Sequence, residues 1–487
     1  MSNLLSSANG IPLQEYGVTE TAGKFGGLTL SQDTIYFEKL GHFHREVIPE
    51  RRVHAKGSGA YGYFEVTADM TKYCKAKFLN EVGKQTPVFA RFSLVVGERG
   101  SSDVARDVRG FALKFYTEEG NWDMVGNNTP IFFISDAIRF PDLIHAMKRH
   151  PQTNLVDPTT AWDFWSSVPE STHQVLMLFT DRGIPDGYRH MNGYGSHTFK
   201  WVNDKNEVTW VKFHFKTEAG IKCLLSSDPK HFGVLDDPDY SSRDLYEHIA
   251  NNKEACWKAY VQLMPYDDAW TYKIDPFDLT RVWSHKDYPL IEYGRLVLNR
   301  NPTNYHAEVE QVAFSPANFV PGIEPSPDKV LQGRLYSYMD SQFYRLCKNY
   351  TTLPINCPYR VKIQNYHRDG ITHTSNGENK PTYWPNSFGG PNPDPAYNRS
   401  EYKLRDTNVG RYPTVEDKQD YFTQPGCLYR NVLKEDERQR VITNIAGSLS
   451  FVSSDQVKAR AIKNFYMVDK DLGTQLAQKL DIKVDFT

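Results

Sequence analysis

The sequence predicts an α+β protein: an eight-stranded antiparallel β-barrel, a long wrapping segment and a C-terminal helical domain. Eight strand-like runs lie mostly in neighbouring groups with turn residues between them. Consecutive hairpins of this number favour a barrel or a strongly curled sheet. Residues 300–420 then show little periodicity, and helical spacing returns in the last block of the chain.

The chain divides into four expected parts. Residues 1–50 are turn-rich, with one short helix predicted within 34–47, and are interpreted as an N-terminal arm. Residues 51–300 carry the strands and form the expected barrel domain. Residues 301–420 are interpreted as the wrapping segment, because so long an irregular stretch usually surrounds a partner or a cofactor. Residues 421–487 form the expected helical domain.

Alternation of side chains marks the strands of the barrel domain. Phe111, Leu113 and Phe115 alternate with Ala112, Lys114 and Tyr116, as residues of half-buried strands do. The predicted strands are 60–67, 87–96, 111–116, 129–135, 197–203, 211–216, 260–266 and 294–299. Helices are predicted at 141–180, 241–258 and 328–347.

Composition argues against several classes of protein. Lys and Arg (57) nearly balance Asp and Glu (59), whereas nucleic-acid binding usually leaves a basic footprint. No apolar run approaches the ~18 residues of a membrane span, and the N-terminus lacks a secretory pattern. We therefore expect an intracellular protein with no nucleic-acid or membrane partner. The six cysteines form no Cys-x-x-Cys pair, so free thiols are expected.

The run Gly57–Gly62 spells the dinucleotide fingerprint G-x-G-x-x-G, but we reject that interpretation. The fingerprint requires a helix after the glycines, and here the chain continues as a strand. Just before this run, Arg51, Arg52 and His54 enter the strand together. A histidine in a glycine-rich turn beside two arginines is a candidate for chemistry rather than for a surface position.

Two further motifs carry candidate functional residues. Arg334 and Tyr338 are four apart, so a helix would stack them on one face, where a guanidinium favours the phenolate. Tyrosine is an axial haem ligand in one class of enzyme. Asn127 precedes an aromatic-rich run, which suggests an amide donor set into a dry pocket. The alternatives are a packed amphipathic helix and an ordinary turn.

Four stretches of this sequence resemble the monofunctional haem catalases. They are RRVHAKGSGAYGYFEVT (51–67), VGNNTPIFFIS (125–135), DRGIPDGYRHMNGYGSHTFKWVN (181–203) and LNRNPTNYHAEVEQVAFSPANFVPGIEPSPDKVLQGRLYSYMD (298–340). The resemblance runs from about residue 25 to the C-terminal helices and fits the short-subunit branch. It implies disproportionation of hydrogen peroxide at haem b, or an oxidised derivative of it, by a homotetramer with interlocked arms.

The resemblance also implies roles for single residues. His54 matches the distal histidine, which shuttles a proton between the peroxide oxygens, and Ser93 matches the serine that orients its ring. Asn127 matches the distal asparagine, a hydrogen-bond donor to peroxide. Tyr338, on the predicted helix of the wrapping segment, matches the iron ligand. The matching haem-binding positions are Arg51, Val53, Arg91, Phe132, Phe140, Arg334 and Arg345, of which Val53, Phe132 and Phe140 line the narrow approach.

Some members of the family bind NADPH at a surface site remote from the haem. The matching positions here are His173, Arg182, Lys216, Val282, Trp283 and His285. The cationic residues among them suit a phosphorylated ribose. The resemblance does not define what the C-terminal helices add to this site.

The sequence departs from the family pattern near the proposed iron ligand. Gln342 and Phe343 stand where most relatives have histidine and arginine, and Cys347 stands where glycine is usual. Ser135 replaces a usual arginine. Gln342 is expected near the haem edge, so it bears on cofactor seating and turnover.

Two alternative functions use the same fold. A fatty-acid hydroperoxide-converting enzyme requires a widened channel, against which the apolar residues Val53, Phe132 and Phe140 argue. A haem-storing or structural protein without turnover does not need the intact distal pair His54 and Asn127. The C-terminus lacks Ser-Lys-Leu, so cytoplasmic and peroxisomal locations are both compatible with the sequence.

Overall fold

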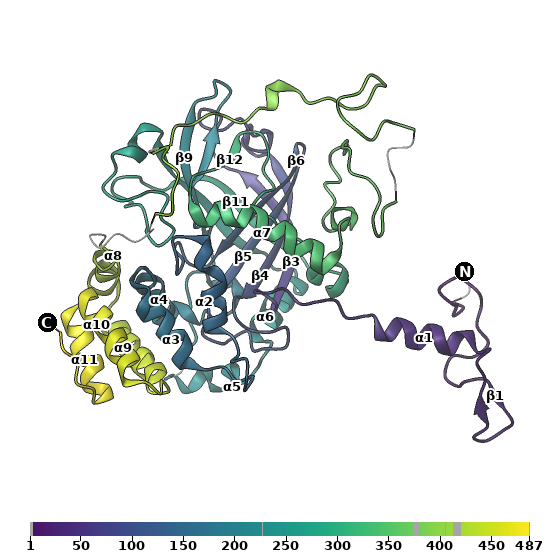
Figure 1. The fold of residues 1–487 in the computed structure, drawn as a ribbon, viewed down its shortest axis with the longest axis horizontal. Helices are drawn as coiled ribbons and strands as arrows, with labels where there is room; N and C mark the ends of the chain where they lie inside the picture. The colour runs from purple at the N-terminus through teal and green to yellow at the C-terminus, as the bar shows by residue number, and fades with distance from the viewer. Residues whose placement is uncertain (1–2, 226, 375–378, 405, 413–419, 487) are drawn as a thin grey trace. The chain divides into compact units, whose positions relative to one another are not determined.

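The computed structural model describes residues 3–225, 227–374, 379–404, 406–412 and 420–486. The chain forms two compact units, Met1–Glu50 and Arg51–Thr487 (Figure 1). Among the described residues, no helix combines the length and the apolar character that crossing a bilayer requires. All six cysteines are free thiols, as predicted.

The unit Met1–Glu50 holds a small hairpin and one helix. Strand β1 (Thr21–Ala22) pairs antiparallel with β2 (Leu28–Thr29), and α1 spans Thr34–His44. The helix begins after Asp33, whose Oδ1 accepts a hydrogen bond from the backbone N–H of Tyr36 at 3.0 Å. The helix predicted within 34–47 is therefore confirmed. No residue of α1 is buried, so this unit presents apolar side chains such as Phe37 and Phe43 on its surface.

The unit Arg51–Thr487 is built around a closed antiparallel barrel. Its ring runs β3-β4-β5-β6-β7-β9-β10-β11 and returns to β3, so eight strands close it within the described residues. Strand β8 pairs with β9 beyond β7, and β12 pairs with β8. The predicted eight-stranded barrel is confirmed. The strands are β3 (Gly57–Val66), β4 (Gln85–Leu94), β5 (Arg109–Thr117), β6 (Gly120–Asn127), β7 (Gly193–Tyr194), β8 (Phe199–Val202), β9 (Val208–Thr217), β10 (Ala255–Pro265), β11 (Ile291–Arg300) and β12 (Ile323–Pro325).

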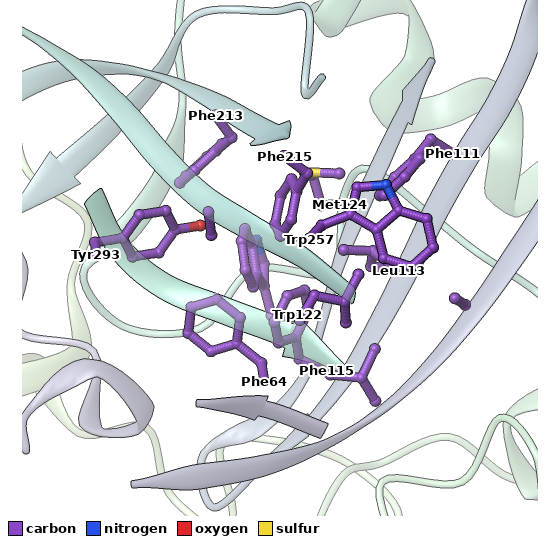
Figure 2. Close-up of a cluster of buried hydrophobic side chains, with 14 of the residues drawn as sticks. Phe64, Phe111, Leu113, Phe115, Trp122, Met124, Phe213, Phe215, Trp257 and Tyr293 are labelled. Atoms are coloured by element: carbon purple, nitrogen blue, oxygen red, sulfur yellow. The ribbon is translucent and has the colours of Figure 1, made fainter. Parts of the chain in front are cut away.

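Aromatic side chains fill the interior of the barrel (Figure 2). Phe111, Leu113 and Phe115 of β5 all point inward, as their alternation predicts. The rings of Phe115 and Trp122 have their centroids 4.5 Å apart. Interlocked rings of this kind resist displacement because close-packed interiors tolerate little change in volume. The barrel is therefore a rigid frame for whatever its outer face carries.

The wrapping segment is anchored to the outer face of the barrel by a buried ion pair. Lys114 Nζ donates to both carboxylate oxygens of Asp123 at 2.9 Å, and both side chains are fully buried. Asp123 Oδ2 also accepts from the Ser315 N–H at 2.9 Å and from Asn318 Nδ2 at 2.8 Å. One carboxylate thus joins β5, β6 and the wrapping segment.

Removing the lysine of this pair is expected to destabilise the protein. Lys114→Met leaves Asp123 buried without its countercharge, which costs on the order of 3–5 kcal/mol of unfolding free energy. Denaturant unfolding followed by tryptophan fluorescence measures the loss. The double variant Lys114→Met/Asp123→Asn should recover part of it, because a neutral amide in place of the carboxylate needs no countercharge. An unchanged midpoint in the single variant would show that the pair does not anchor the segment.

The strand predicted at 129–135 is wrong. The strand before it, β6, ends at Asn127, and residues 129–135 have no regular structure. Phe133 and Ile134 are fully buried in a cluster of helices rather than on one face of the sheet. A continuous apolar run with a proline at position 130 therefore indicated burial but not a strand.

Most of the predicted helical segments are present, but with different boundaries. The helix predicted at 241–258 is wrong beyond Ala250, because β10 already begins at Ala255, and the stretch predicted at 141–180 divides into three helices. The predicted helix at 328–347 is confirmed as α7, and α9–α11 pack with α3 and α4 around one apolar cluster (Figure 1). The helices are α2 (Phe140–Met147), α3 (Pro158–Ser167), α4 (Thr172–Phe179), α5 (Phe232–Leu235), α6 (Tyr240–Ala250), α7 (Lys329–Leu346), α8 (Thr423–Cys427), α9 (Glu435–Leu449), α10 (Asp455–Val468) and α11 (Lys470–Leu480).

Candidate active site

Three residues on neighbouring strands form a row on the outer face of the barrel. Ser93 of β4 lies opposite Gly110 of β5, and Gly110 lies opposite Asn127 of β6. Directly opposed residues of antiparallel strands project to the same face. His54, which precedes β3, joins this row because its Nδ1 lies 3.0 Å from Ser93 Oγ. The structure thus brings together the three residues expected on the distal side.

Gly110 is a member of this group that sequence reasoning missed. A Cβ atom at this position would lie 2.8 Å from His54 Nδ1 and would also overlap Ser93 Oγ. Only glycine leaves room for the histidine–serine pair at this place on the strand. No local signal distinguishes this glycine from the other glycines of the chain.

The backbone holds His54 in an uncommon conformation. Its φ is +65°, a left-handed value that costs free energy in a residue with a side chain. The N–H of His54 donates to the Val95 carbonyl at 3.1 Å, and Arg91 Nη1 donates to the His54 carbonyl at 2.8 Å. These contacts fix the residue from both sides. Enclosure of the ring lowers its pKa to about 3, and the guanidinium groups of Arg91, Arg334 and Arg51 add to the effect.

The helix α7 lies against this face of the barrel and carries Tyr338. Arg334, one turn earlier, donates from Nη2 to the Tyr338 hydroxyl at 2.7 Å and to the Val125 carbonyl of β6 at 2.9 Å. The predicted stacking of Arg334 and Tyr338 on one helix face is confirmed. A guanidinium that donates to a phenolic oxygen stabilises its anionic form.

Behind Arg334 lie two residues that sequence reasoning missed. Arg334 Nη1 lies 2.6 Å from His197 Nε2, and His197 Nδ1 lies 2.7 Å from Asp328 Oδ2. Arginine has only donors, so Nε2 accepts and Nδ1 carries the hydrogen that Asp328 receives. Asp328 also caps α7 through Oδ1, which accepts from the N–H groups of Val330 and Leu331. A continuous chain therefore runs Asp328–His197–Arg334–Tyr338.

Only part of this chain had a signal in the sequence. An aspartate at the start of a predicted helix is a typical N-cap, so the sequence indicated a structural role for Asp328 but no functional one. His197 lies 137 residues from Arg334 along the chain, so only the folded structure reveals the contact. Burial lowers the pKa of His197 although Asp328 opposes the shift. Because Nε2 accepts from Arg334, the ring is neutral and lies between two charged groups.

The expected haem-binding arginines form a buried cationic cluster. Arg51 and Arg345 both lie near the carboxylate of Glu310, at 3.7 Å and 3.9 Å, and both donate to the backbone carbonyls of the segment 309–312. Burial lowers the pKa of Arg345 to about 10 and that of Arg51 well below its ordinary value. Within the described residues, the buried atoms Arg51 Nη1, Arg91 Nε and Arg345 Nε have no hydrogen-bond partner. Such a cluster suits a buried anion, because unpaired buried donors are costly.

The three apolar residues expected along the approach to the haem belong to one hydrophobic cluster. Phe132 and Phe140 stack with ring centroids 6.4 Å apart, and Val53 packs against the same apolar cluster. Phe132 is almost completely buried, and Val53 and Phe140 are partly buried. These three residues thus belong to one packed group, which we call the apolar wall.

The positions that depart from the family pattern take part in local contacts. Gln342 is buried, and its Oε1 accepts from Arg345 Nη2 at 3.1 Å, so it touches the cationic cluster. Ser135 Oγ donates to Glu170 Oε2 at 2.6 Å. Cys347 follows the last residue of α7 with a φ of +73°, and Phe343 is exposed.

Comparison with known proteins decides the family. The family model described as "Catalase" matches residues 6–390, and the model "Catalase-related immune-responsive" matches residues 415–480. The chain belongs to the catalase family. It is 53% identical to Catalase-A of Dictyostelium discoideum, with 99% of this chain and 97% of that protein covered. It is 52% identical to a catalase of Glandirana rugosa, with 98% and 90% covered.

Solved structures agree with this assignment. Catalase A of Saccharomyces cerevisiae superposes with a TM-score of 0.94 at 41% identity, covering 98% of this chain and 99% of that one. A bacterial catalase superposes with a TM-score of 0.93 at 42% identity, covering 99% and 96%. The chain therefore has the fold of these catalases along nearly its whole length, as the sequence predicted.

Membership of the catalase family implies a haem cofactor, and the residues present fit one. The buried guanidinium groups with unpaired N–H donors suit the two carboxylates of haem. The phenol of Tyr338, held by Arg334, suits an iron ligand, and the apolar wall around Phe132 suits the flat porphyrin.

A second region of this catalase-family chain is a pocket of about 900 Å³ between the barrel and the C-terminal helices. Lys216 Nζ donates to the Tyr194 hydroxyl at 3.0 Å, and His173 is buried with Nδ1 3.2 Å from the Thr280 carbonyl. Gln424 of α8 closes one side through two hydrogen bonds to the backbone of Val282, both 3.0 Å. All six residues expected for NADPH line this pocket, namely His173, Arg182, Lys216, Val282, Trp283 and His285.

Two histidines with lowered pKa values predict how the stability of the fold depends on pH. Burial lowers the pKa of His54 to about 3 and that of His173 to about 4, below the ordinary value of 6.5 that applies in the unfolded chain. Between about 6.5 and 4 the unfolded chain binds protons that the folded chain does not, so stability is full above this window and falls as pH drops through it. Burial raises the pKa of Asp107 to about 6, which acts in the opposite direction.

A variant separates the contribution of His173 to the pH dependence of stability from that of Asp107. We expect denaturant midpoints between pH 7 and pH 4.5 to fall less steeply in His173→Asn than in the parent, because one proton-binding group is absent from the unfolded chain. Equal slopes in the two proteins would show that His173 is not buried in its neutral form.

Proposed function

We propose that this chain disproportionates hydrogen peroxide to water and dioxygen at a haem whose iron is bound by Tyr338. The observation that carries the proposal is the pairing of His54 with Ser93 beside Asn127 on the barrel face, with α7 packed against that face and Arg334 donating to Tyr338. These groups come from β4, β6, α7 and the segment before β3, so they meet only in the folded chain.

His54 is the proton shuttle of this proposal. Ser93 Oγ can accept from Nδ1–H, and this pairing leaves the lone pair of the ring on Nε2. Nε2 then takes a proton from one oxygen of peroxide and returns it to the other, so that the O–O bond breaks with release of water. The low pKa of the ring keeps it neutral, and therefore able to accept a proton, at any physiological pH.

The other groups bind the haem and the peroxide and exclude larger molecules from the site. When bound, haem iron exchanges electrons with peroxide, so that one molecule is reduced to water and another is oxidised to dioxygen. Asn127 donates a hydrogen bond that holds the substrate beside His54. Val53, Phe132 and Phe140 exclude larger reductants and bulk water. Arg51, Arg91 and Arg345 would hold the haem carboxylates, and Tyr338, with Arg334 donating to its hydroxyl, would hold the iron.

Oxygen evolution by the purified holoenzyme tests the proposal. Hydrogen peroxide should give rapid dioxygen release measured at an oxygen electrode, and a fatty-acid hydroperoxide should give none. A haem-loaded protein that releases no dioxygen from hydrogen peroxide would contradict the proposed function.

We also propose that the pocket beside the C-terminal helices binds NADPH. Five cations line it among the described residues, against a single carboxylate, Asp420; they are Arg182, Lys212, Lys216, Lys273 and Arg281. This excess suits the phosphates of a dinucleotide. The volume of about 900 Å³ is in the range of small-molecule sites.

Charge removal should weaken this binding. Lys216→Met removes one charged donor, and a charged hydrogen bond contributes roughly 1.5–3 kcal/mol, so the Kd for NADPH should rise by about tenfold or more. Fluorescence of the bound nicotinamide measures the Kd. Lys258→Met, on β10 and paired with Glu292, is the matched control outside the pocket. Equal affinities in all three proteins would place the dinucleotide elsewhere.

Two further proposals concern assembly and domain roles. The exposed apolar side chains of the arm, residues 1–50, support a homotetramer in which this arm contacts other copies of the chain. We assign the distal haem pocket to residues 51–300, the iron ligand to the wrapping segment 301–420 and part of the dinucleotide site to the helical segment 421–487.

A further inference from the structure

A buried lysine connects the dinucleotide pocket to the residues behind the proposed iron ligand. Lys212 lies on β9 between the inward-pointing Val211 and Phe213, so its side chain faces outward and lines the pocket. It is only 5% exposed. Its Nζ donates to the Ser196 carbonyl at 2.8 Å and lies 5.4 Å from the centroid of the Trp283 ring.

Ser196 belongs to both regions. It lines the pocket, and it directly precedes His197, whose Nε2 accepts from Arg334. Its φ is +60°, and its hydroxyl donates to the Thr129 carbonyl at 2.9 Å, two residues after Asn127. A positive φ persists in a residue with a side chain only where the surrounding contacts fix it, and here hydrogen bonds hold Ser196 at its carbonyl and at its hydroxyl.

Charge also couples the two regions. Burial lowers the pKa of Lys212 to about 8. The negative charges of Asp328, Asp278 and Asp275, in this order, act against this shift and raise the pKa. In return, Lys212 helps to lower the pKa of Asp328 against the effect of burial, after the larger contributions of His197 and of the Leu331 N–H. The ammonium therefore acts on the first member of the chain Asp328–His197–Arg334–Tyr338.

We propose that Lys212 is a positioning residue that transmits occupancy of the dinucleotide pocket to the Tyr338 ligand. A phosphate near Lys212 reduces the positive field at Asp328 and His197. His197 then accepts more strongly from Arg334, Arg334 donates less to the phenolic oxygen, and the phenolate keeps more of its negative charge. The inference rests on the proposed function in that Tyr338 binds the iron.

The test uses the holoenzyme and a readout other than turnover. The midpoint potential and the ferric absorption spectrum of the haem report the charge on its axial ligand. Both are measured in the parent, Lys212→Met, Lys212→Gln and Lys212→Arg, with and without saturating NADP⁺, which is not a reductant. Lys200→Met is the matched control, because Lys200 is an equally buried lysine on β8 that pairs with Glu324 and Ser400 instead.

We expect NADP⁺ to lower the potential of the parent. Lys212→Met should have the lower potential without nucleotide and should show no further shift, whereas Lys212→Arg should respond like the parent. Lys200→Met should lose stability but keep the shift. If Lys212→Met does not retain haem, Lys212→Gln, which keeps a donor to Ser196 without the charge, should behave in the same way.

Two results would overturn the inference. The first is the same nucleotide-induced shift in Lys212→Met or Lys212→Gln as in the parent. The second is a parent protein that binds NADP⁺ without any shift. If the parent does not bind NADP⁺ at all, the NADPH proposal fails, and the comparison of parent and Lys212→Met without nucleotide decides the role of Lys212: equal potentials and spectra reject it, and a lower potential supports it.

Discussion

His54→Ala should lower the rate of oxygen evolution from hydrogen peroxide by about 10²–10⁴-fold, the usual contribution of a positioned acid–base group. The loss concerns proton transfer, so the haem content and the ferric spectrum should stay close to those of the parent. An oxygen electrode and the haem absorbance, recorded on the same sample, separate the two effects. His190→Ala is the matched control, because His190 is a buried histidine that contacts the Gly220 carbonyl.

A second variant separates the contribution of the His54 ring to the rate from the contribution of its orientation. Ser93→Ala leaves His54 in place but removes the partner of Nδ1, so we expect a smaller loss than in His54→Ala. The rate of the parent should be constant above about pH 4 and should fall only as the pH approaches about 3, where the ring becomes protonated. Full activity in His54→Ala would assign the proton transfer to another group.

Tyr338→Phe should abolish both oxygen evolution and the tyrosinate-type ferric spectrum. The ring and its packing stay, but the oxygen that would bind iron is lost, and Arg334 loses one of its three acceptors. Haem should therefore dissociate faster and give a changed charge-transfer band. Absorption spectroscopy before and after gel filtration measures both the ligation and the retention of haem.

A neighbouring tyrosine provides the control for this experiment. Tyr336 lies on the same helix two residues earlier and is 65% exposed, so Tyr336→Phe should keep the spectrum and the activity of the parent. A parent-like ferric spectrum in Tyr338→Phe would show that a different residue binds the iron.

Local patterns succeeded where a segment has one buried face or one clear boundary. The alternation of Phe111, Leu113 and Phe115 correctly predicted an inward-facing strand, and the spacing of Arg334 and Tyr338 correctly predicted one helix face. The pattern failed at 129–135, because that run is buried among helices and carries no alternation that could distinguish a strand. It also failed at 251–258, where the helix α6 ends and β10 begins within a few residues.

The amino-acid pattern alone was enough to predict the barrel, the helix that carries Tyr338 and the resemblance to a family whose motifs include His54 and Asn127. The residues that support His54 and Tyr338 could be found only in the folded chain. His54 and Ser93 are 39 residues apart, Arg334 and His197 are 137 apart, and Asp328 and His197 are 131 apart. Periodicity reports a residue's neighbours within a few positions, whereas strand register and helix docking bring such distant side chains into hydrogen-bond contact. For the same reason, the role of Gly110 and the link through Lys212 and Ser196 are visible only in the folded chain.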